Sequence, residues 1–118
     1  MSTPTPLATA LDQLWQRFLP EMRQRVALLE AAAHTCAVNT LSAAQTAEAH
    51  AVAHKLAGSL GSFNLTRGTV LARQLEMIYA TKDAPGPEYA PALRSLASEL
   101  HQLIESRPPA QKQQAAKG

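Results

Sequence analysis

The stretch that most constrains the fold lies between Ala49 and Phe63, where apolar side chains recur at intervals of three and four residues. An α-helix turns by about 100° per residue, so these intervals place the apolar side chains on one side of a helix. With Leu56 at the centre of that side, the other members fall within about 40° of it: Ala49, Val52, Leu60 and Phe63. The stretch therefore predicts a one-sided helix that must bury its apolar stripe against other helices.

Similar spacing predicts helices along most of the chain, and no segment alternates with the period of a strand. The expected helices are a short one over 6–18, a second that restarts after Pro20 and runs to about residue 38, a third over 43–61, a fourth from Thr66 through Ile78, and a fifth from about Glu88 to Ile104. Ser42 and Thr66 are the expected N-caps of the third and fourth helices, and Pro91 fits only the first turn of the fifth. Short connections between one-sided helices favour an all-α, up-down four-helix bundle with an additional short N-terminal helix across one end.

Composition supports this fold and excludes several classes of protein. Aromatic residues make up only 4 % of the chain while alanine is abundant, which is typical of close-packed helices. No run approaches the ~20 apolar residues of a membrane span, and the N-terminus does not resemble a signal peptide. The single cysteine, Cys36, lies on an apolar stripe and is interpreted as a core residue. We therefore expect a cytoplasmic protein without membrane contact.

The charge distribution argues against binding to nucleic acid, although the isoelectric point is about 9.0. Residues 1–106 contain eight Lys/Arg and nine Asp/Glu, so their net charge is −1. The excess of positive charge comes from Arg107, Lys112 and Lys117, which lie in a polar segment. A nucleic-acid interface needs basic residues clustered on one folded face. We therefore expect one domain over 1–106, followed over 107–118 by a disordered tail or linker.

His54 lies about 160° from Leu56 on the helical wheel, close to the most exposed line of the helix. Small residues surround it on that line: Ala47, Ala51, Gly58 and Gly61. Each glycine inside a helix costs about 1 kcal/mol relative to alanine, so two of them on one face suggest that bare backbone is needed there. A surface histidine without a function is the alternative interpretation. The pattern favours a histidine that a large partner can approach.

The run Ala53–Ser59 (AHKLAGS), continuing through Leu65 to Leu75-Glu76, resembles the histidine-containing phosphotransfer (HPt) domain family over about residues 7–106. The resemblance implies that His54 accepts a phosphoryl group and exchanges it with an aspartate of a receiver domain, as one step of a two-component phosphorelay. It also implies that the receiver carries the Mg²⁺, that a hybrid histidine kinase is a further partner, and that this chain has neither kinase activity nor a cofactor. We expect a monomer.

The sequence departs from the family pattern at two positions. Ala57 stands where the family usually has a lysine, and Asn64 stands where it usually has a glycine. Asparagine is the non-glycine residue that best tolerates a left-handed backbone, so the turn at position 64 can be kept. The change at position 57 removes a positive charge one turn from His54. For this reason a phosphorylation-independent helical docking module stays open as the alternative function.

Candidate contacts to the phosphoryl group or to the partner surround His54 in the sequence: Lys55, Gly58, Ser59, Gly61, His50 and Ala51. Lys55 could supply the missing cation, although it points about 100° around the helix from His54. Ser59 could instead hydrogen-bond within its own helix, and Glu76 is interpreted as a surface or helix-packing carboxylate. His50 and His54 have the spacing of a zinc pair, but no third ligand is evident, so no metal site is predicted.

Overall fold

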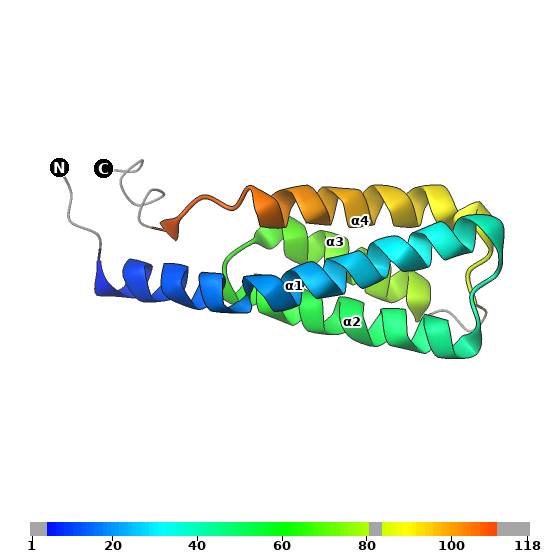
Figure 1. Ribbon diagram of the computed structural model, residues 1–118, viewed down its shortest axis with the longest axis horizontal. Helices are drawn as coiled ribbons and strands as arrows, with labels where there is room; N and C mark the ends of the chain where they lie inside the picture. The colour runs from blue at the N-terminus through cyan, green and yellow to red at the C-terminus, as the bar shows by residue number, and fades with distance from the viewer. Residues whose placement is uncertain (1–4, 81–83, 111–118) are drawn as a thin grey trace.

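Helices form nearly all of the structure in a computed structural model that describes residues 5–80 and 84–110. In chain order they are α1 (Pro6–Val38), α2 (Ala43–Ser62), α3 (Thr66–Tyr79), the short 3₁₀ turn η1 (Pro87–Tyr89) and α4 (Ala90–Glu105), with no strand among the described residues. Successive helices run in opposite directions around a shared core (Figure 1). The all-α up-down bundle is therefore confirmed.

The expected break at Pro20 is wrong, because α1 continues through it as one helix. Trp15 precedes Pro20 and Met22 follows it, and both side chains are buried in the same core. This burial keeps the two halves of α1 in line. Proline has no N–H to donate to the carbonyl one turn earlier, but Pro20 is exposed, so water can bond to that carbonyl instead. The separate N-terminal helix is thus the first half of α1, and it extends beyond the end of α2 (Figure 1).

Residues 107–110, which the sequence analysis assigned to the tail, contact this first half of α1. The Arg107 guanidinium lies 4.9 Å from the ring centroid of Trp15 and 5.8 Å from that of Phe63. Asp12 Oδ1 accepts hydrogen bonds from Nη1 of Arg107 at 3.2 Å and from the backbone N–H of Ala110 at 2.7 Å. The Arg107 side chain is only 3 % exposed. The remainder of the expected tail, residues 111–118, lies outside the described residues.

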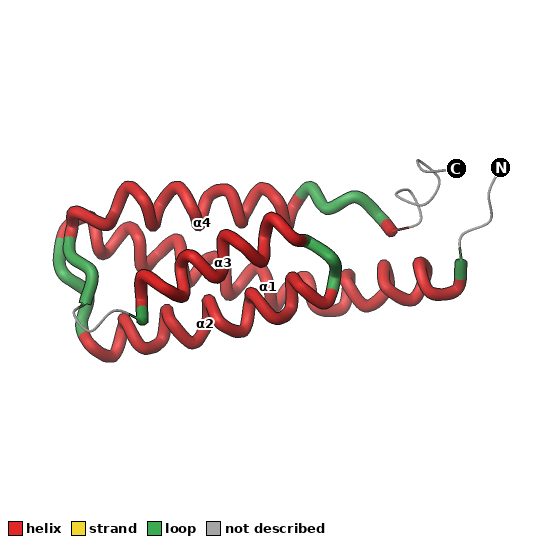
Figure 2. The backbone as a smooth tube through the Cα atoms, turned by 180° about the vertical axis from the view of Figure 1, so that it is seen from behind, coloured by secondary structure: helices red, strands yellow, loops and turns green. Residues whose placement is uncertain are grey.

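The hairpin of α2 and α3 positions the residues around His54. Leu56 and Leu60 of α2 and Leu71 and Leu75 of α3 are fully buried between the helices and the rest of the core. Figure 2 shows the two helices side by side, joined by a short loop. In that loop Asn64 has a φ of 60°, so its predicted left-handed backbone is confirmed.

Apart from the expected break at Pro20, the helix ends lie within two residues of the predicted ones. The Ser42 side chain accepts a hydrogen bond from the N–H of Gln45, and the Gln45 side chain bonds back to the N–H of Ser42, so the expected N-cap is confirmed as a capping box. Thr66, expected to be a cap, is instead the first residue of α3. Pro91 lies in the first turn of α4, as predicted.

Replacing Pro20 with alanine should raise the free energy of unfolding by about 1–2 kcal/mol. The substitution restores a helical N–H inside α1, and the larger entropy of the unfolded chain offsets part of this gain. Denaturant titration measures the change. Pro91→Ala is the control and should bring no such gain, because a proline in the first turn breaks no helical hydrogen bond. A Pro20→Ala protein less stable than the parent would contradict the argument.

Candidate functional site

His54 lies on the outer face of α2, with 63 % of its side chain exposed. Its sequence neighbours Ala53 and Leu56 are buried, so the backbone beneath the imidazole is fixed by the core. The Nδ1 atom of His54 lies 2.7 Å from Oε2 of Glu76 on α3. A carboxylate only accepts hydrogen bonds, so this contact favours the tautomer with its proton on Nδ1. The lone pair of Nε2 is then available for reaction, on a side chain that is mostly exposed.

Glu76 is the functional candidate that sequence reasoning missed. Its side chain is 18 % exposed and contacts three residues: His54, Arg73 through its other oxygen at 3.3 Å, and His50, whose Nε2 lies 4.0 Å from Oε2. The hydrogen bond from His54 lowers the pKa of the Glu76 carboxyl, with smaller contributions from the charges of His54, Arg73 and His50. The carboxylate is therefore kept ionised, as a base that orients an imidazole must be.

The antiparallel register of α2 and α3 explains why these residues meet. Gly61 lies opposite Thr69, since a Cβ built at position 61 would be 3.7 Å from the Thr69 hydroxyl. Seven residues back along α2 and seven forward along α3, the same register brings His54 opposite Glu76. The leucine of the Leu75-Glu76 dipeptide fixes the direction of Glu76. Because Leu75 is buried in the core, Glu76 beside it points toward the edge of the helix. The Leu75-Glu76 dipeptide was therefore the available signal.

The glycines leave an open surface next to His54. A Cβ built at Gly58 would have no atom within 4 Å beyond its own helix, and Gly61 is exposed as well. Ala51, one turn before His54 on the same face, is also exposed. The surface that these three residues form, hereafter the small-residue face, would let another protein approach the α2 backbone beside the imidazole.

Lys55 and Ser59 lie on the opposite side of the small-residue face, toward α1. The Ser59 hydroxyl accepts a hydrogen bond from Nη1 of Arg25 on α1 at 3.2 Å. Lys55 is one turn before Ser59, so it occupies the same line of α2. It is exposed, and its side chain makes no ion pair or hydrogen bond within the described residues. The structure thus brings His50 and His54 together around Glu76 and places Lys55 and Ser59 on another side.

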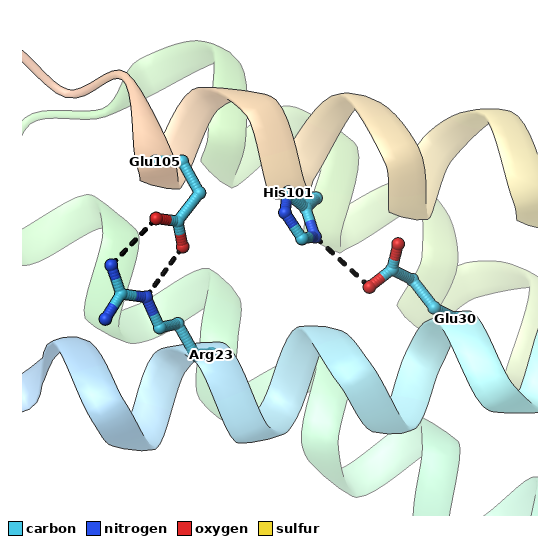
Figure 3. A network of polar contacts seen from close by, with 4 residues as sticks. All are labelled: Arg23, Glu30, His101 and Glu105. Atoms are coloured by element: carbon cyan, nitrogen blue, oxygen red, sulfur yellow. Dashed lines mark hydrogen bonds and ion pairs between the residues drawn. The ribbon is translucent and has the colours of Figure 1, made fainter.

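A second exposed histidine offers a comparison. His101 of α4 is 53 % exposed, and its Nδ1 lies 3.2 Å from Glu30 of α1 (Figure 3). Four residues on, Glu105 pairs with Arg23, so a carboxylate stands where His54 has Gly58. Beside His101, the Glu105 side chain therefore fills the space that Gly58 leaves open beside His54. Within 5–80 and 84–110, no group of three or more His, Cys, Asp or Glu residues is arranged to hold a metal ion.

Comparisons with known proteins identify the family to which the chain belongs. The family model described as "Hpt domain" matches residues 13–111, and the chain therefore belongs to the Hpt domain family. Protein RcaC of Microchaete diplosiphon is 35 % identical over 95 residues, which are 80 % of this chain and 15 % of that protein. No solved structure matches. Membership of the family places the chain in the phosphorelays of two-component signalling, where Hpt domains interact with receiver and kinase components.

One further finding concerns membranes. No helix in the described part of the chain is both long enough and apolar enough to cross a bilayer.

Replacing His54 with glutamine should raise the pKa of the Glu76 carboxyl toward its ordinary value of 4.5, because the largest cause of its lowering is removed. The pKa of the Glu76 carboxyl is lower in the folded chain than in the unfolded chain, so its ionisation stabilises the fold at pH values above the unfolded pKa. That stabilisation is lost as the pH falls through the lower pKa of the folded state. Carbon-13 NMR of the carboxyl groups measures the titration. Glu99 is the control: its pKa is also lowered, by Arg67, and should stay unchanged.

Proposed function

We propose that the chain is a phosphorelay intermediate that accepts a phosphoryl group on Nε2 of His54 and passes it to, or takes it from, an aspartate of a receiver domain. The observation that carries the proposal is the contact between Nδ1 of His54 and Glu76, made by a side chain that is 63 % exposed. A neutral imidazole is a good nucleophile near neutral pH. With Nδ1 protonated and oriented, only Nε2 is free to attack.

The transfer balances with the residues at hand and the partner's aspartyl phosphate. The lone pair of His54 Nε2 attacks phosphorus and forms the N–P bond, while the P–O bond to the aspartyl oxygen breaks. The aspartate leaves as a carboxylate with that electron pair. The imidazole becomes a cation that keeps its proton on Nδ1, and Glu76 stabilises this cation through the 2.7 Å contact. Phosphoryl transfer depends mainly on positioning and charge, so the chain needs no acid–base machinery of its own.

The residues around His54 would then form the docking surface. Gly58, Gly61 and Ala51 give clearance for the loops of the receiver, and His50, Lys55 and Ser59 border this surface. The receiver brings the Mg²⁺, and a hybrid histidine kinase supplies the phosphoryl group. We place this exchange in the cytoplasm, with the chain acting as a monomer without kinase activity of its own.

A docking module that works without phosphorylation is the second candidate. Ala57, at the position where the family pattern has a lysine, favours it. The structure shows that Ala57 is buried, with 1 % exposure, so a lysine at this site would have to extend its stem across the core margin. The two functions differ in whether His54 becomes labelled.

His54→Gln should abolish phosphoryl labelling while the melting temperature stays within about 2 °C of the parent, since the side chain is exposed. The label is added from a phosphorylated receiver domain with Mg²⁺ and followed by mass spectrometry. His101→Gln is the matched control, because His101 is similarly exposed and also contacts a glutamate; it should label like the parent. Label that remains on His54→Gln, or that resists mild acid, would overturn the assignment.

Gly58→Gln should fold at least as stably as the parent, because glutamine is a better helix former by up to ~1 kcal/mol and the added atoms enter open space. Transfer from the receiver should nevertheless fall by about tenfold or more, because the larger side chain obstructs docking. A thermal melt and a timed transfer assay on one preparation test both points. Normal transfer would show that the receiver does not dock beside His54.

A further inference from the structure

Arg73 contacts the same carboxylate that orients His54. Its Nη1 lies 3.3 Å from Oε1 of Glu76, while Oε2 of that residue contacts His54. Among the described residues, Arg73 is the one arginine or lysine that pairs with Glu76. Its side chain is 58 % exposed, so little packing opposes a change of its rotamer. The positive charge of Arg73 is therefore separated from His54 by a single residue, Glu76, which contacts both.

The register of the hairpin places Arg73 beside the next turn of α2. Three residues back from Glu76 on α3, Arg73 lies opposite Ala57, which is three residues on from His54. The same register brought Gly61 opposite Thr69. Position 57 is the one at which the sequence lacks the lysine of the family pattern. Arg73 on α3 thus supplies a positive charge opposite position 57, where α2 has an alanine instead of a lysine.

The charge balance after transfer calls for such a cation. A phosphoryl group on Nε2 adds negative charge near Glu76, which is already ionised, and the imidazolium offsets only part of it. Guanidinium groups bind phosphate oxygens through two parallel N–H bonds, and they are charged at every relevant pH. Arg73 can meet the phosphoryl oxygens while staying within the field of Glu76.

Lys55 is the alternative cation for the phosphoryl group, but it lies on the side of α2 that faces α1. Ser59, one turn after Lys55 on that line, bonds to Arg25 of α1. Glu76 and Arg73 approach His54 from α3, on the other side. With Nδ1 turned toward α3, the ring and the lysine stem lie along different lines of the helix.

We propose, on the basis of the function proposed above, that Arg73 binds the oxygens of the phosphoryl group on His54 and takes the place of a cation from α2. The bound group is stabilised both as it arrives and after the N–P bond has formed. Arg73 is in this sense a catalytic residue, whereas Glu76 positions the imidazole.

Phosphoramidate tests the proposal without a protein partner. His54 Nε2 attacks its phosphorus, the N–P bond of the reagent breaks, and ammonia leaves after taking a proton from water. Arg73→Gln should label about five- to tenfold more slowly than the parent, and Arg73→Lys should fall between the two. Arg67→Gln is the matched control, because Arg67 lies on the same helix, is 59 % exposed and pairs with Glu99; it should label like the parent.

A second measurement separates contact with the phosphoryl group from a structural role. In ¹H–¹⁵N spectra of the parent, the side-chain N–H signal of Arg73 should shift when His54 is phosphorylated, and that of Arg67 should not. Equal labelling rates for Arg73→Gln and Arg67→Gln, or a rate lowered by Lys55→Ala instead, would overturn the role of Arg73 and leave the proposed function standing. A parent that phosphoramidate fails to label on His54 would overturn the proposed function itself.

Discussion

The packing of α2 against α3 is the interaction on which the site depends, because His54 and Glu76 come from different helices. Leucines from both helices bury one face of the hairpin, and Gly68 lets the Leu60 side chain approach to 3.0 Å of where a Cβ would lie. This close packing fixes the register, and the register fixes the 2.7 Å contact between the imidazole and the carboxylate. A single slip between the helices by one residue would turn the two groups away from each other.

Much of the fold follows from hydrophobic periodicity, because each helix carries its own apolar stripe. Pro20 shows where that reasoning ends. The cost of a proline inside a helix is a local quantity, whereas Trp15 and Met22 on its two sides are held in one core by tertiary packing. The sequence alone does not tell which effect is larger. Arg107 is a similar case, since proline-rich polar composition predicted a tail while its guanidinium stacks on Trp15.

The site was predictable in part for a related reason. Exposure of His54 and the small residues beside it can be read from the wheel of one helix, and both agree with the structure. Glu76 could be placed on its own wheel, but its contact with His54 depends on how two helices align, and a wheel contains no such information. The same limit applies to Arg73, whose distance from the imidazole is set by the hairpin and by the turn at Asn64.

The division of the site between two helices makes the histidine's tautomer a reporter of tertiary structure. If α3 opens locally while α2 stays helical, Glu76 withdraws and the ring exchanges its proton freely between the two nitrogens. His54 would then lose the contact that orients its ring and fixes its tautomer, although the residue itself is unchanged. A chain folded only into separate helices would carry His54 without its contact to Glu76, so the imidazole would be oriented only once the hairpin closes.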